Sequence, residues 1–420
     1  MRLIFFKNTL FLMLTLLISC ANSGGDSNAF AKAEFKKETV LQESPSQEPI
    51  VTAANRTALY LPFLKDKKVG VVTNKSGLIF KSTPHTERES THLVDSLIAN
   101  GINVTRVFSP EHGFRGDVDA GEQVKDGKDP KTGLNIISLY GKNKKPSQEQ
   151  LEGLDVILFD IQDVGVRFYT YISTLTYVME AAAEKGIPVI VLDRPNPNAH
   201  YIDGPTLEKE HSSFLGMHEV PLVYGMTIGE YAMMVNGEGW LKDKMQCNLT
   251  VIPLENWDYT TPYSLPTRPS PNLPNDKSIN LYPSLGFFEG TTINAGRGTE
   301  MQFQIFGAPD FSPSNFTYSY TPEPNFGSKD PKHNGQLCYG VDLRAQEYMS
   351  RVNLEWLIEA YTASTDKNKF FKTASFTLHA GNKKLQQQIQ DGYTFKEIKR
   401  DWIKDIENFK NIRKQYLMYE

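Results

Sequence analysis

The sequence has few cysteines and histidines, no excess of basic residues, and only one long apolar run. Only 3 cysteines occur in 420 residues, which excludes a disulfide-rich framework. The 8 histidines are scattered without the spacing of zinc ligands. The formal net charge of -4 lacks the basic footprint of a nucleic-acid-binding protein, so we expect no nucleic acid as a partner. After the N-terminal run, no stretch is long and apolar enough to cross a membrane.

Familiar nucleotide-binding and hydrolase motifs are also missing. No Gly-x-Gly-x-x-Gly follows the first predicted strand, which removes the main support for dinucleotide binding. The chain has no Walker A loop, no Gly-x-Ser-x-Gly nucleophile elbow and no His-Glu-x-x-His zinc motif. The sequence therefore predicts neither a metal ion nor an organic cofactor.

The N-terminus has the features of an export signal in the expected order. Arg2 and Lys7 supply positive charge, and the apolar run 10–18 that follows is too short to span a bilayer. The segment Leu17–Cys20 resembles the lipobox of bacterial lipoproteins, in which the cysteine is lipidated and becomes the new N-terminus. A diacylated Cys20 would anchor the protein stably, so we expect a cell-envelope lipoprotein, periplasmic or associated with the outer membrane. The alternative is an ordinary signal peptide with an incidental cysteine.

Composition divides the chain further. The segment after Cys20 is polar and cannot bury enough surface to fold alone, whereas the remaining stretch of roughly 370 residues exceeds one typical domain. Thr260–Pro283 holds six prolines, so we expect no regular structure there. The predicted segments are a signal peptide at 1–20, a flexible tether at 21–50, a Rossmann-like catalytic domain at 51–256, a proline-rich linker at 257–283 and a C-terminal domain at 284–420.

The first domain alternates short apolar runs with helical patterns. The runs are rich in β-branched residues, as buried parallel strands are, at Val69–Thr73, Val104–Phe108, Val156–Phe159 and Val189–Leu192, with weaker candidates at Ile136–Leu139 and Leu249–Pro253. Helices are expected at His92–Asn100, Tyr171–Lys185 and Thr227–Asn236, with a short one opened by Ser147 and Gln150. This alternation predicts an α/β fold with a Rossmann-like, doubly wound parallel sheet.

The C-terminal domain has a different pattern. We expect helices at Leu354–Thr362 and Phe395–Tyr419 and a strand at Ser375–His379. These elements predict a smaller α+β domain that is closed by the last helix.

Polar residues follow four predicted strands of the first domain at the points where the strands end. They are Asn74; Glu111 and His112; Asp160, Gln162, Asp163 and Arg167; and Asp193, Arg194 and Asn196. Turns attract such residues for structural reasons too, but the carboxyl ends of parallel strands share one edge, where ligands bind. Four such loops in succession therefore predict a site.

Glu111 is the first choice for a catalytic acid or base, because a short turn rich in proline and glycine would hold it rigidly at the cleft. Its alternative roles are to cap a helix or to pair with Arg115. His112 could orient a carboxylate, bind substrate or serve a structural role. Asp160 is a candidate for a second carboxylate, and its alternative is to accept hydrogen bonds from loop amides.

Five segments together resemble the exo-β-N-acetylmuramidase family, whose members were long known only as a domain of unknown function. The segments are Val71–Gly77, Phe108–Gly116, Phe159–Tyr171, Leu192–Pro197 and Phe288–Glu300, and the resemblance runs from about Lys67 to the C-terminus. It implies release of a terminal, non-reducing N-acetylmuramic acid (MurNAc) from peptidoglycan fragments such as MurNAc-β-1,4-GlcNAc during cell-wall turnover. It also implies a Rossmann-like domain, a smaller C-terminal domain and a cleft between them.

The implied substrate suggests roles for further residues. Muramic acid carries a lactyl carboxylate, for which Arg297 is the first candidate partner and Arg167 and Arg194 are rivals. Glycoside hydrolysis usually needs two carboxyl groups, so Glu111 would act as the acid with Asp160 or Glu300 as its partner. Glu300 could instead form a salt bridge with Arg297. If the acetamido group of the substrate attacks, Asp163 or Gln162 could orient it and Tyr169 could assist; Asn74, Asp193 and Asn196 complete the predicted binding residues.

Two other functions fit the same pattern. The first is a lipid-anchored protein that binds muramyl sugars without cleaving them, and the second is hydrolysis of another envelope bond, such as an amide. In each case the expected partners are peptidoglycan-derived saccharides or muropeptides, together with the membrane that holds the anchor.

Overall fold

The computed structural model describes residues 48–82, 85, 89–115 and 126–419. The predicted signal peptide with Cys20, and most of the predicted tether, lie outside the described residues. No helix within the described ranges has the length and apolar character needed to cross a bilayer. The predicted domain boundaries stay predictions, and residues 47–420 form one compact unit.

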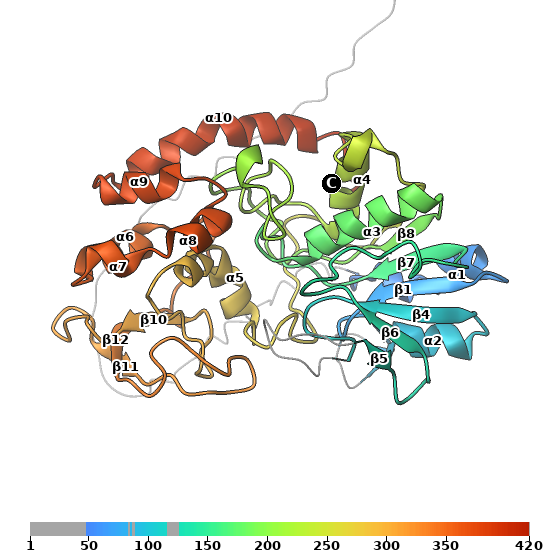
Figure 1. The fold of residues 1–420 in the computed structure, drawn as a ribbon, viewed down its shortest axis with the longest axis horizontal. Helices are drawn as coiled ribbons and strands as arrows, with labels where there is room; N and C mark the ends of the chain where they lie inside the picture. Colours follow the sequence, from blue (N-terminus) through green and yellow to red (C-terminus); the bar gives the residue numbers. More distant parts are fainter. Residues whose placement is uncertain (1–47, 83–84, 86–88, 116–125, 420) are drawn as a thin grey trace, which may run out of the picture. The chain divides into compact units, whose positions relative to one another are not determined.

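A parallel sheet forms the first part of the chain (Figure 1). In the described ranges it has seven strands in the order β5-β6-β4-β1-β7-β8-β9. Their bounds are β1 Val69–Thr73, β4 Val104–Ser109, β5 Gly127–Lys128, β6 Asn135–Ser138, β7 Val156–Asp160, β8 Val189–Leu192 and β9 Leu249–Ile252. Every neighbouring pair is parallel except β5 and β6. Without β5, the strands follow the doubly wound order, with the topological switch point between β1 and β7, so the predicted fold is confirmed.

Helices cover both faces of this sheet. Val71 of β1 packs in one hydrophobic cluster with α1 (Thr57–Leu64) and α2 (Leu93–Ala99). The next residue, Val72, packs in a second cluster with α3 (Tyr171–Lys185) and α4 (Ile228–Gly237). Because successive side chains of a strand point to opposite faces, a continuous apolar run is what a sheet covered on both faces requires. A small hairpin of β2 (Leu78–Phe80) and β3 (Ser90–His92) follows β1.

Capping residues and glycines in the sequence mark the ends of several of these helices, as expected. Thr227 and Glu230 form the predicted capping box of α4, and Gly186 ends α3 in the left-handed conformation, with φ of 71°. Ser147 and Gln150 do exchange capping hydrogen bonds, but the segment is only a turn, so the short helix expected there is absent from the described chain. Short 3-10 helices occur at Ala53–Asn55, Lys209–His211 and Lys242–Lys244.

The C-terminal part combines a small antiparallel sheet with helices, as predicted. The sheet has the order β10-β12-β11, with β10 at Ile305–Ala308, β11 at Tyr318–Tyr320 and β12 at Cys338–Asp342. The helices are α5 Asp276–Leu285, a 3-10 helix at Gly286–Gly290, α6 Glu355–Ala363, α7 Lys367–Phe370, α8 Thr373–Ala380, α9 Lys384–Gln390 and α10 Phe395–Arg413. One hydrophobic cluster joins α3 to this part of the chain.

The strand predicted at Ser375–His379 is wrong, because this segment lies inside α8. Phe376 and Ala380, one helical turn apart, are both buried, and Gly381 ends the helix in the left-handed conformation with φ of 79°. A Cβ atom at Gly290 would lie 2.4 Å from the Cα atom of Phe376, so the glycine allows α8 to approach the 3-10 helix. Tertiary packing therefore overrides the short alternating pattern.

Regular structure also appears in Thr260–Pro283, where none was expected. Asn275 caps α5 by accepting a hydrogen bond from the backbone N–H of Ser278 at 2.9 Å. Ile279 and Leu285 bury the apolar face of this helix, which tolerates Pro283 near its end. The many prolines of this segment predicted a lack of regular structure, although Asn275 is a favourable N-cap residue for the helix that follows.

Candidate active site

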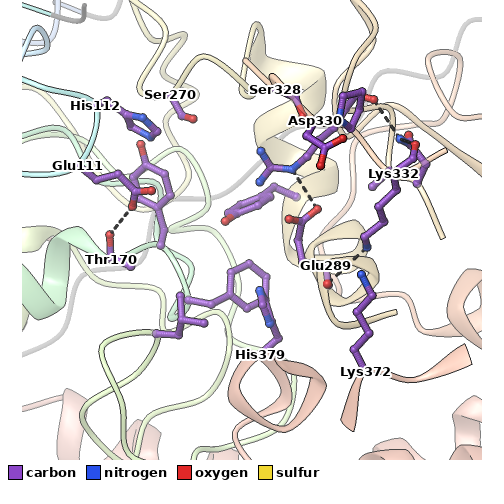
Figure 2. A pocket seen from close by; sticks show the side chains of 18 residues that line it. Glu111, His112, Thr170, Ser270, Glu289, Ser328, Asp330, Lys332, Lys372 and His379 are labelled. Atoms are coloured by element: carbon purple, nitrogen blue, oxygen red, sulfur yellow. Dashed lines mark hydrogen bonds and ion pairs between the residues drawn. The ribbon is translucent and has the colours of Figure 1, made fainter. Parts of the chain in front are cut away.

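A cavity of about 500 Å³ lies between residues of the sheet domain and residues of the C-terminal part (Figure 2). This volume is typical of a site for a small ligand. The sheet domain contributes Glu111, His112, Phe168, Tyr169, Thr170 and Leu215, and Ser270 comes from the proline-rich segment. The C-terminal part contributes Tyr282, Glu289, Asn294, Ala295, Arg297, Ser328, Asp330, Pro331, Lys332, Lys372 and His379.

Glu111 stands on a strained turn directly after β4. The next residue, His112, has φ of 73°, a left-handed conformation that is uncommon for a residue other than glycine, and Gly113 follows with φ of 77°. Such strain is of order 1–3 kcal/mol and clusters at functional sites. The hydroxyl of Thr170 donates to Glu111 Oε2 at 3.2 Å. The turn therefore presents a carboxyl group to the cavity on a fixed backbone.

Glu289 provides a second carboxyl group from the opposite side of the cavity (Figure 2). It lies in the 3-10 helix that follows α5, and its Oε1 accepts a hydrogen bond from Arg297 Nε at 3.0 Å. Burial raises the pKa of Glu289, but the charges of Arg297, Lys332 and His379 outweigh this effect and lower it to about 2. Glu289 is therefore an ionised carboxylate at neutral pH.

Basic side chains gather around Glu289. Lys332 Nζ donates to the backbone carbonyls of Phe288 at 2.6 Å and Ile293 at 3.1 Å, and burial lowers the pKa of this lysine to about 8. Lys372 also lines the cavity, and its side chain forms no hydrogen bond or ion pair with another described residue. This wall of the cavity can thus receive an anionic ligand at Lys372.

His379 lies at the C-terminal end of α8. Its Nδ1 is 2.8 Å from the backbone carbonyl of Ser375, and burial lowers its pKa. Its own backbone carbonyl accepts a hydrogen bond from Arg167 at 3.0 Å. The position of this histidine therefore depends on contacts with the sheet domain.

The structure brings four of the predicted site residues to the cavity. Glu111, His112, Tyr169 and Arg297 all line it. The hydroxyl of Tyr169 already donates a hydrogen bond within the protein, to the backbone carbonyl of Pro269 at 2.7 Å. The catalytic and binding roles of these residues stay predictions.

Asp160 and Arg194 are not in the cavity lining, contrary to the roles predicted for them. They form a buried bidentate ion pair, with Nε to Oδ1 at 2.6 Å and Nη2 to Oδ2 at 2.8 Å. Because each group satisfies the other, Asp160 is not placed to act as the second carboxylate and Arg194 is not placed to bind a lactyl group. The pair instead joins the ends of β7 and β8.

Arg167 is fully buried and also outside the cavity lining. Its guanidinium donates to the backbone carbonyls of Pro205 at 2.7 Å, Val220 at 3.0 Å and Ala380 at 2.8 Å, in addition to His379. Burial lowers the pKa of Arg167 to about 9. Its role is to tie the loop after β7 to the end of α8, so the prediction that it could bind substrate does not fit its position.

Five further predicted binding residues stabilise the loops at the sheet edge and do not line the cavity. The carboxylate of Asp163, for example, accepts hydrogen bonds from the backbone of Gly165 at 2.7 Å and from the hydroxyl of Tyr224. Gln162 donates to the backbone carbonyl of Pro195 at 2.7 Å. These two, with Asn74, Asp193 and Asn196, are buried and form hydrogen bonds within the protein.

Glu300 is exposed and does not line the cavity. The partner of Arg297 is Glu289 rather than Glu300. Neither of the roles predicted for Glu300 therefore fits its position.

Sequence reasoning missed Glu289, Lys332, Lys372 and His379. Glu289 lies within the segment Phe288–Glu300, so it was close to the residues chosen, but nothing local separates it from Glu300. Lys332 lies in a turn, Lys372 directly precedes α8 and His379 lies near the end of α8, and only the fold brings them to Glu289.

Comparison with known proteins agrees with the fold and identifies the family. The family model for the N-terminal part of the exo-β-N-acetylmuramidase NamZ matches residues 69–277, and the model for its C-terminal part matches residues 280–419. The peptidoglycan β-N-acetylmuramidase NamZ of Bacillus subtilis (strain 168) is 37% identical over 98% of this chain and 100% of its own length.

Two solved structures from Bacteroides fragilis NCTC 9343, each described as a DUF1343 family protein, have the same fold. One is 40% identical with a TM-score of 0.79, and the other is 28% identical with a TM-score of 0.74. Each match covers 88% of this chain and 99% of the solved chain. The two family models together account for nearly all of the described residues, and the chain belongs to the exo-β-N-acetylmuramidase NamZ family.

Proposed function

We propose that this protein is an exo-acting β-N-acetylmuramidase that releases terminal MurNAc from peptidoglycan fragments, with Glu111 as its general acid. The observation that carries the proposal is the cavity, in which two carboxyl groups and several basic groups face one another. The family and the name of the Bacillus subtilis relative support a muramidase, and the cavity supplies the groups that the reaction needs.

The surroundings of Glu111 suit a general acid. The substrate's glycosidic oxygen must receive a proton as its bond to the anomeric carbon breaks, and a carboxyl group on a rigid turn can supply it. The Thr170 hydroxyl donates a hydrogen bond to Oε2 of Glu111 at 3.2 Å and so helps to fix the orientation of the carboxyl group. Glu289 does not suit this role, because it is ionised at neutral pH.

Incubation with MurNAc-β-1,4-GlcNAc tests the function directly. We expect equal amounts of free MurNAc and GlcNAc, detected by mass spectrometry. Saturable binding without any cleavage would favour the alternative of a muramyl-sugar binding protein. In a parallel incubation with a muropeptide, release of the peptide with the disaccharide intact would show hydrolysis of an amide bond instead.

Lys372 is the best-placed group to recognise the lactyl carboxylate. Arg297 is held by Glu289, and Lys332 is held by backbone carbonyls, whereas the ammonium group of Lys372 has no such partner among the described residues. Replacing Lys372 with methionine should raise KM for a MurNAc glycoside about 10-fold, because a charge-assisted hydrogen bond contributes about 1.5–3 kcal/mol. The change in kcat should be small.

Two comparisons make this prediction specific. Lys369→Met is the matched control, because Lys369 is an exposed lysine on α7 that pairs with Asp366 outside the cavity. The corresponding GlcNAc glycoside, which lacks the lactyl group, should be hydrolysed poorly and equally by wild type and Lys372→Met. An equal rise in KM for both glycosides would show that Lys372 does not recognise the carboxylate.

We also propose that Cys20 carries a lipid that holds the enzyme at a membrane of the cell envelope. The order of positive charge, apolar run and cysteine supports this location, as does the polar segment that would act as a tether. In the native host, Cys20→Ala should move the protein from the membrane fraction to the soluble fraction, measured by immunoblotting. Retention of the variant in the membrane fraction would rule out the anchor.

A further inference from the structure

Glu289 is the group in the cavity whose chemistry the proposed function leaves unassigned. Figure 2 shows it on the wall opposite Glu111, beside the side chain of Lys332. Its Oε1 is held by Arg297, and Lys332 is fixed beside it by the carbonyls of Phe288 and Ile293. The surrounding protein therefore fixes a negative charge at this point of the substrate cavity.

We propose that Glu289 accepts a hydrogen bond from the N–H of the substrate's 2-acetamido group, so that the acetamido oxygen, and not a protein group, attacks the anomeric carbon. This inference rests on the proposed function and specifies its chemistry. The sequence suggested Asp163 or Gln162 for this task, but their hydrogen bonds with Tyr224, Gly165 and Pro195 hold them within the loops.

The contacts of Glu289 argue against a role as nucleophile. A nucleophilic carboxylate must form a bond with carbon, and two neighbouring cations reduce the basicity of this one. The same cations do not prevent it from accepting a hydrogen bond. They hold the carboxylate in a fixed orientation, as a group that stabilises developing charge requires. Asp330, the third acidic residue in the lining, is solvent-exposed and lacks this support.

The reaction then balances in two steps. The acetamido carbonyl oxygen bonds to C1 of MurNAc while the bond from C1 to O4 of GlcNAc breaks, and O4 takes the electron pair and the proton of Glu111. The resulting oxazolinium ion carries positive charge, which Glu289 stabilises through the N–H. Water then bonds to C1 and gives a proton to Glu111, the oxazolinium ring opens to restore the acetamido group, and the product keeps the β configuration.

A series of 4-nitrophenyl β-muramides with zero to three fluorine atoms on the N-acyl group tests this inference in the wild-type protein. Each fluorine makes the acyl oxygen a weaker nucleophile, so kcat/KM should fall with every fluorine added. A rate independent of fluorine would overturn the proposal. Failure of the proposed function would look different, because even the unfluorinated muramide would then release no 4-nitrophenol.

A second experiment separates attack by the acetamido oxygen from attack by Glu289. An activated 2-deoxy-2-fluoro muramyl fluoride lacks the acetamido group and traps a protein nucleophile as a covalent adduct. We expect no increase in the mass of the intact protein. A peptide modified at Glu289 would contradict the proposal and identify this residue as the nucleophile.

The variant Glu289→Gln tests the role of the charge. It should lower kcat about 100-fold while KM changes little, because stabilisation of a developing charge is lost. A purely structural role would instead lower the midpoint of thermal unfolding and weaken MurNAc binding. An unchanged kcat would contradict the proposal. If this variant does not fold, the fluorinated substrates still test the proposal in the wild-type protein.

Discussion

Replacing Glu111 with glutamine should lower kcat for MurNAc-β-1,4-GlcNAc by about 10³-fold, within the range attributed to general acid catalysis. The sugar leaving group is poor and needs the proton that glutamine cannot supply. The variant should keep its fold, because glutamine fits the turn after β4 and its amide oxygen can still accept the hydrogen bond from Thr170. The rates are measured with purified proteins by quantifying released MurNAc.

The dependence on the leaving group distinguishes an acid from a merely structural residue. On 4-nitrophenyl MurNAc, whose leaving group needs no proton, Glu111→Gln should lose far less activity in the bond-breaking step than on the disaccharide. Glu300→Gln is the matched control, since Glu300 is an exposed glutamate outside the cavity lining. Equal losses of Glu111→Gln on both substrates, or a loss as large in Glu300→Gln, would contradict the assignment.

Replacing Arg194 with methionine should lower the free energy of unfolding by about 3–5 kcal/mol, because it leaves the buried carboxylate of Asp160 without its partner. Unfolding in urea, followed by circular dichroism, measures this loss. The expected loss is large because the ion pair links the ends of β7 and β8 in the interior of the sheet domain.

A double variant tests whether the unpaired carboxylate is the cause of this loss. The double variant Asp160→Asn/Arg194→Met should recover part of the lost stability at neutral pH, since no buried charge remains. A double variant less stable than Arg194→Met would show that desolvation of Asp160 is not the cause.

The sheet domain could be predicted well because its elements carry local signals. The central strands are short apolar runs rich in β-branched residues, and α3 ends at a glycine that adopts the left-handed conformation. Glu111 could be chosen for a similar reason, since a strand end followed by a Pro-Glu-His-Gly turn fixes its position. Ser375–His379 shows the limit of such signals, because a five-residue pattern fits a strand and a helix equally and packing against Gly290 decides.

The rest of the cavity could not be predicted because a polar residue after a strand has two possible uses. Asp160 and Arg194 occupy strand ends in the same way as Glu111 does, yet they neutralise each other inside the fold. Glu289 lies in the 3-10 helix at Gly286–Gly290, whereas Lys372 directly precedes α8 and His379 lies near its end, so only the packing of α8 against the 3-10 helix joins them. Only the three-dimensional arrangement shows which polar groups remain available to a ligand.

A crystal structure of the Glu111→Gln variant with MurNAc-β-1,4-GlcNAc tests the account most directly. We expect the MurNAc residue in the cavity, with its glycosidic oxygen beside the side chain at position 111, its acetamido N–H bonded to Glu289 and its lactyl carboxylate near Lys372. Binding of the disaccharide outside this cavity, or in it with the acetamido group turned away from Glu289, would contradict the account.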